Sequence, residues 1–86
     1  VGNISLDFQI IVEVRQFEMN SQSAVILVAL WQIVREEDKA SLLMKRSEFM
    51  ERVNAERYES IVAGMSKVNA DLSREIGRAL NSLTHD

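Results

Sequence analysis

Residues 24–34 form an apolar run in the middle of the chain, Ala-Val-Ile-Leu-Val-Ala-Leu-Trp-Gln-Ile-Val. Successive side chains of a β-strand point to opposite faces of the sheet, so this run predicts a strand that is apolar on both faces. One face carries Val25, Leu27, Ala29, Trp31 and Ile33, and the other carries Ile26, Val28, Leu30 and Val34. Each face therefore needs its own cover, as in strands at the centre of a packed sheet.

A half-buried strand precedes this run. Every even position from 4 to 14 is apolar and most odd positions between them are polar, which is typical of a strand with one wet face. The alternation changes phase after Val14, because the next apolar residues, Phe17 and Met19, have odd numbers. One extra residue at positions 15–16 explains the change, and we expect a β-bulge there.

Polar segments separate the strands. Residues 20–22, Asn-Ser-Gln, predict a hairpin turn, and the charged residues 35–39 predict a second one. A third strand is expected over residues 40–49. Residues 42–44 do not alternate, so this segment also fits the start of a helix, but its position between a charged turn and a helix cap favours the strand.

A long amphipathic helix is expected from Ala55 to about Leu83, because apolar residues recur there at steps of three and four. Asn54 is a suitable N-cap, and Val53 and Tyr58 are spaced for a hydrophobic staple. Such a helix would be about 43 Å long. A ten-residue strand spans only about 33 Å, so the helix should overhang the sheet.

The glycines and the charged residues of the helix lead to two further predictions. The apolar stripe continues through Gly64 and Gly77, so we expect close packing at both positions rather than breaks. Glu75 and Arg78 are spaced to form an ion pair on the polar side of the helix.

The order of elements predicts an α+β fold with a three-stranded antiparallel sheet (β-β-β) and one long amphipathic C-terminal helix packed on one face. The absence of proline and of low-complexity stretches indicates a single domain over residues 1–86. One helix covers only one face. The other face calls for another chain, a symmetric mate or a part of the natural protein that is absent here, and we expect this chain to be a fragment of a larger domain.

The register of the first hairpin decides whether Trp31 lies in the core or at an interface, because a one-residue slip exchanges the two faces of a strand. Pairing Met19 with Ser23 would place Ile10 opposite Trp31 and bring the indole into the core. An apolar patch then remains on the opposite face, where such patches mark association. The candidate partner-binding residues are Ile11, Ile26, Val28 and Leu30.

Composition restricts the function. The net charge is −3, and the ten basic residues alternate with thirteen acids, which argues against nucleic acid as a partner. The chain has no cysteine, so neither a disulfide nor a thiolate site exists. A chain of this size buries only about 60 to 65 percent of its unfolded surface, so association is the remaining way to gain stability.

The sequence offers no evident catalytic or metal site. The single histidine, His85, is next to the last residue, where chains usually fray. Three glycines are too few for a phosphate loop or a nucleophile elbow. The acids at 36–38 lack the spacing of a calcium loop, and Asp7 and Glu13 lie about 20 Å apart along their strand. We therefore expect no enzyme activity, metal or cofactor.

Several short runs resemble the C-terminal half of the ABC-type transport auxiliary lipoproteins, the family of paraquat-inducible protein C. The resemblance covers nearly all of the chain, and its motifs are mostly structural. They are an Arg-x-Phe-Glu strand end, a Leu-x-Ala-x-Trp strand, the segment Arg-Ser-Glu-Phe and a Ser-x-x-x-x-x-Leu-x-x-Glu-Ile helix, found at residues 15–18, 27–31, 46–49 and 66–76.

This resemblance implies a component of Gram-negative lipid-transport machinery, held on the periplasmic side of the outer membrane by an N-terminal lipid. Such proteins work with a mammalian-cell-entry (MCE) protein and an ABC transporter. The lipid-bearing cysteine and the N-terminal half of the family's domain are not present in this sequence. In the family, the only membrane attachment is this N-terminal lipid, so the chain itself could not be anchored.

The leading hypothesis is a non-catalytic periplasmic interaction domain, which either forms a homo-oligomer or binds an MCE-type transport protein. The alternative is a small homodimerising or ligand-sensing α+β module. A nucleic-acid module is a third possibility, which the negative charge disfavours.

Overall fold

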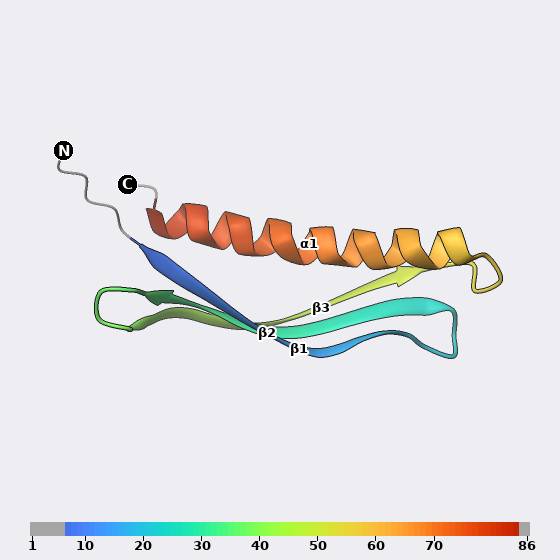
Figure 1. The fold of residues 1–86 in the computed structure, drawn as a ribbon, viewed down its shortest axis with the longest axis horizontal. Helices are drawn as coiled ribbons and strands as arrows, with labels where there is room; N and C mark the ends of the chain where they lie inside the picture. Colours follow the sequence, from blue (N-terminus) through green and yellow to red (C-terminus); the bar gives the residue numbers. More distant parts are fainter. Residues whose placement is uncertain (1–6, 85–86) are drawn as a thin grey trace.

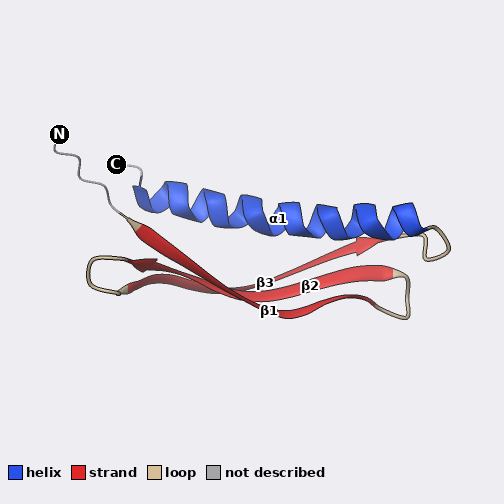
Figure 2. Ribbon diagram, viewed as in Figure 1, coloured by secondary structure: helices blue, strands red, loops and turns tan. Residues whose placement is uncertain are grey.

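The computed structural model describes residues 7–84, which form three strands followed by one helix. The strands are β1 (Phe8–Met19), β2 (Ala24–Arg35) and β3 (Ser41–Arg52), and the helix is α1 (Tyr58–Thr84). Both strand pairs are antiparallel, in the order β1-β2-β3. Figure 1 and Figure 2 show α1 lying along one face of the sheet, which confirms the predicted fold class. The predicted first positions of the first strand, Ile4 and Leu6, lie outside the described residues, as does His85.

The predicted bulge in β1 is confirmed, because the pairing with β2 shifts between Val14 and Gln16. The predicted pairing is wrong by two residues: Met19 lies opposite Val25, and Trp31 lies opposite Val12. An even shift leaves every side chain on its expected face. Trp31 therefore faces the same side of the sheet as the apolar residues of β1.

The turn between β1 and β2 explains the two-residue error. The backbone N–H of Asn20 donates to the carbonyl of Ala24 at 2.8 Å, so four residues lie between β1 and β2. The Asn20 side chain accepts hydrogen bonds from the N–H groups of Gln22 and Ala24. Ser23 has a φ of 59°, the left-handed conformation that follows a type I turn in many hairpins.

The third strand and the helix begin and end later than expected. Each strand has twelve residues, or about 40 Å. The helix has 27 residues and is also about 40 Å long, so the expected overhang is wrong.

Asn54 caps a preceding turn by accepting from the N–H of Glu56, and the helix begins at Tyr58. Tyr58 is 78% exposed while Val53 packs against the core, so the predicted staple is not formed.

The core lies between α1 and the strands β2 and β3. The buried residues include the whole predicted inner face of β2 together with two helix residues, namely Val25, Leu27, Ala29, Trp31, Ile33, Val68 and Leu72. Gly64 is a close-packing point, because a Cβ there would lie 2.4 Å from Cγ1 of Val53. The same expectation is wrong for Gly77, where a Cβ would meet nothing within 4 Å.

A chain of polar contacts joins the core to the helix. The indole N–H of Trp31 donates to Oγ of Ser47 at 2.9 Å, and the Ser47 hydroxyl donates to Oε1 of Glu75. Lys45 of β3 donates to the other carboxylate oxygen of Glu75. The expected ion pair within the helix is therefore replaced by one between Glu75 and the sheet, which holds α1 against β3.

Candidate interaction surfaces

The four predicted partner-binding residues lie on one face of the sheet, opposite the face that α1 covers. We call Ile11, Ile26, Val28 and Leu30 the far-face patch. Three of them lie on β2, and Ile11 lies beside them on β1, opposite Gln32. The structure thus brings the predicted residues together on a single surface.

The far-face patch is less exposed than its position suggests. Val28 is only 6% exposed, because it lies between Gln16 and Glu48, whose long side chains flank it. Leu30 is half-buried between Glu13 and Arg46 in the same way. Ile11 is 41% exposed and is the most accessible member of the patch.

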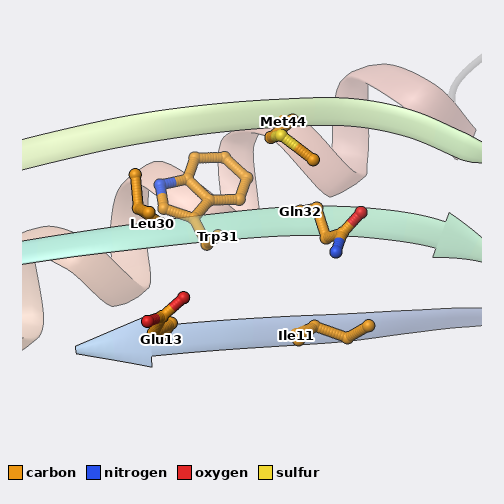
Figure 3. Close-up of a pocket in the computed structure, with 6 residues that line it drawn as sticks. All are labelled: Ile11, Glu13, Leu30, Trp31, Gln32 and Met44. Carbon is orange, nitrogen blue, oxygen red and sulfur yellow. The ribbon is translucent and has the colours of Figure 1, made fainter. Parts of the chain in front are cut away.

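A shallow pocket of about 130 Å³ opens at one end of the far-face patch (Figure 3). Met44 borders it from β3 and is 68% exposed. Methionine is flexible and polarizable, so this rim can adapt to differently shaped apolar partners. The residues that line the pocket are Ile11, Glu13, Leu30, Trp31, Gln32 and Met44.

Charged groups border the far-face patch. Arg15 and Arg46 flank a second, more open hollow of about 400 Å³ over Val28 and Leu30. Arg15 pairs with Glu13 at 3.3 Å, and Arg46 pairs with Glu48 at 3.4 Å. Each cation is therefore matched by a neighbouring acid, and the patch resembles the apolar centre and polar rim of a protein interface.

A second apolar surface, on β1, was not foreseen from the sequence. The helix lies over β2 and β3, and the helix-side residues of β1 extend beyond it. We call these residues the β1 stripe, and their exposed fractions are 39% for Ile10, 42% for Val12, 54% for Val14, 40% for Phe17 and 36% for Met19. The widths of the elements predict that one strand is left uncovered, because a helix about 10 Å wide covers only about two strands spaced about 4.8 Å apart.

The polar cluster on the helix side serves the fold. Partial burial raises the pKa of Glu75, but hydrogen bonds from Lys45 and Ser47 outweigh it and hold the pKa of the carboxyl below its ordinary value. The carboxylate is thus held ionised by its structural partners. Within residues 7–84, the structure shows no group of three His, Cys, Asp or Glu side chains placed to hold a metal ion.

Comparisons with known proteins point to transport. No curated protein and no solved structure matches the chain significantly. The described part of the chain contains no helix that is long and apolar enough to cross a membrane. One family model does match, over residues 2–77, which is most of the chain. This protein therefore belongs to the family of ABC-type transport auxiliary lipoprotein components.

Proposed function

We propose that this chain is a non-catalytic periplasmic interaction domain of an auxiliary lipoprotein that serves an ABC transporter and an MCE-type protein in lipid transport between membranes. The family assignment supports the transport role. The observation that carries the proposal is the far-face patch, an apolar surface with a charged rim that the helix of this chain does not cover.

The patch acts by contact. The exposed side chains of Ile11 and Met44 enter a concave site on the partner, while the neighbouring charges set the orientation. On the other side of the sheet, α1 and its bond to Ser47 keep β2 and β3 rigid. The chain thus presents a preformed surface, which lowers the entropy cost of docking.

The proposed location rests on the family resemblance. This resemblance implies an N-terminal lipid that holds such proteins on the periplasmic side of the outer membrane, which supports a periplasmic location for this domain. The absence of cysteine from the chain means that the lipid anchor of such a protein would lie outside this segment.

The test measures binding of the purified chain to the purified periplasmic part of the MCE-type protein from the same transport system. Ile11→Asp introduces a charge at the most accessible point of the patch, and Leu30→Asp introduces one at its centre. Each change should weaken binding at least about tenfold, because a buried unpaired charge at an interface costs several kcal/mol.

Gln9→Asp is the matched control, because Gln9 is exposed on the same strand and the same face but outside the patch. It should leave the affinity within about twofold of the wild-type value. Circular dichroism must show the same fold for all three variants. Unchanged binding by both Ile11→Asp and Leu30→Asp would refute the far-face patch as the partner site.

A second candidate function is a homodimerising module. The β1 stripe favours it, because five exposed apolar side chains along an edge strand are a surface that association would cover. Binding to the transport partner and self-association use different surfaces, so the two functions are compatible.

A further inference from the structure

Apart from the bulge residue Arg15, the backbone groups on the outer edge of β1 belong to apolar residues. The carbonyl of Asp7 accepts from the N–H of Glu36, and the N–H of Asn20 donates to Ala24. Backbone groups alternate in direction along an antiparallel strand, so odd residues before the bulge and even residues after it point toward β2. The residues that point outward are Phe8, Ile10, Val12, Val14, Phe17 and Met19.

We propose that β1 pairs antiparallel with β1 of a second copy of this chain, around a twofold axis at Val12. This register aligns outward-pointing backbone groups on both strands and places the apolar side chains of those residues on the helix side. It continues past the bulge in both copies, because each strand skips Arg15 as it already does against β2. The apolar pairs are Val12 with Val12, Ile10 with Val14, and Phe8 with Phe17.

The charges of the edge disfavour two neighbouring registers. On the far face it places Ile11 opposite Glu13, whose carboxylate already pairs with Arg15 at 3.3 Å. An axis at Glu13 would oppose two carboxylates directly, and an axis at Ile10 would oppose Asp7 to Glu13. The Val12 axis leaves a single like-charge pair, Glu18 opposite Asp7, at each end of the ladder.

The size and character of the edge favour a second copy as the occupant. Five pairs that each exchange two backbone bonds would give about ten hydrogen bonds and a continuous six-stranded sheet. The opposite edge of the sheet, β3, carries Lys45, Arg46 and Glu48, and charges of this kind discourage strand addition. The outward positions of β1 are apolar, and in the dimer Phe8, Ile10, Val12, Val14 and Phe17 each meet another apolar residue.

Sedimentation equilibrium of the purified chain tests the proposal over a range of protein concentrations. The wild-type chain should form a dimer. Val12→Lys places two ammonium groups face to face on the axis and should shift the chain to a monomer, with unchanged circular dichroism because Val12 is 42% exposed. Gln9→Lys, on the same strand, lies opposite the neutral Gln16 and should remain a dimer.

A second variant tests the register by gain of affinity. Glu18→Lys replaces the repulsion from Asp7 with attraction at both ends of the ladder and should tighten the dimer by about three- to tenfold at low salt. A high salt concentration should reduce this gain, because exposed charges are screened. An equal affinity for Glu18→Lys and the wild type at low salt would refute this register.

A wild-type chain that sediments as a monomer at every concentration, or a dimer that Val12→Lys leaves intact, would overturn the proposal. Leu30→Asp lies on β2, away from the edge, and should dimerise normally. Failure of the partner contact proposed above and failure of the dimer are therefore distinguished in the same set of variants.

Discussion

Ser47 is a buried polar residue at a decisive point of the core, only 5% exposed. Its hydroxyl accepts the indole N–H of Trp31 and donates to Glu75. Ser47→Ala should lower the free energy of unfolding by about 1 to 3 kcal/mol, because it leaves the buried indole N–H without an acceptor. Urea denaturation measures the effect. Ser41→Ala, which removes an exposed hydroxyl that donates to Gln32, should change stability by less than about 0.5 kcal/mol.

The two glycines of α1 form a matched pair for a second test. Gly77→Ala should stabilise the protein by about 0.5 to 1 kcal/mol, because alanine favours the helix and the new Cβ meets nothing within 4 Å. Gly64→Ala should destabilise it by about 1 to 3 kcal/mol, because its Cβ would overlap Val53. Thermal unfolding of both variants should show shifts of opposite sign; shifts of the same sign would contradict this account of Gly64.

At the scale of elements, the attachment of α1 to β3 depends on the ionisation of Glu75. Partial burial opposes the charged form, but bonds from Lys45 and Ser47 lower the pKa of the carboxyl below its ordinary value of 4.5. A carboxyl with a lowered pKa in the folded state stabilises the fold above the unfolded-state pKa. This contribution is lost as the pH falls through the folded-state pKa.

We therefore expect the free energy of unfolding to fall less steeply below pH 4.5 in Glu75→Gln than in the wild type. Urea denaturation at a series of pH values measures the slopes. Ser41→Ala, which removes an exposed hydroxyl and no carboxylate, should retain the wild-type slope. Identical slopes for Glu75→Gln and the wild type would show that this carboxylate does not contribute to acid sensitivity.

The pattern of apolar residues predicts β1, β2, α1 and the bulge, because burial imposes that pattern on the sequence. The third strand is predicted only from its position between a charged turn and a helix cap, because residues 42–44 do not alternate. The boundaries were harder, since local hydrogen bonds decide them. Asn54 has the chemistry of a helix cap but closes a separate turn, which delays the helix to Tyr58. The pairing of Met19 depended on the conformation of Ser23, and its positive φ has no clear sequence signature.

At the scale of the whole molecule, apolar side chains on the helix side of the sheet are buried on β2 and exposed on β1. The β1 stripe is exposed, so polar changes there should cost little stability in the monomer. We expect Val14→Thr, at 54% exposure, to change the unfolding free energy by less than about 0.5 kcal/mol. Val25→Thr, at 0% exposure, should cost about 1 to 3 kcal/mol, because it buries a hydroxyl. Denaturation at a concentration that keeps the chain monomeric compares the two.

The sequence located the far-face patch because side-chain alternation fixes the faces of β2 even when the exact pairing is wrong by two residues. It did not locate the β1 stripe. The even residues of β1 have the pattern of a buried face. The widths of the elements indicate that one helix leaves a strand uncovered, but only the lateral position of α1 shows that this strand is β1. The lateral placement of a helix on a sheet depends on tertiary packing, such as the close approach of Gly64 to Val53, which periodicity does not encode.

Trp31 is the only tryptophan of the chain, and it is 1% exposed beneath the helix. Its emission spectrum is therefore an intrinsic optical probe of whether α1 is docked. Detachment of the helix would admit water to the indole and shift the fluorescence to longer wavelengths. Trp31 also borders the far-face pocket, but its indole is buried with Ser47 in the core on the helix side, so binding at the far-face patch would leave the ring shielded from water. Unlabelled protein can thus report on helix docking independently of binding at the far-face patch.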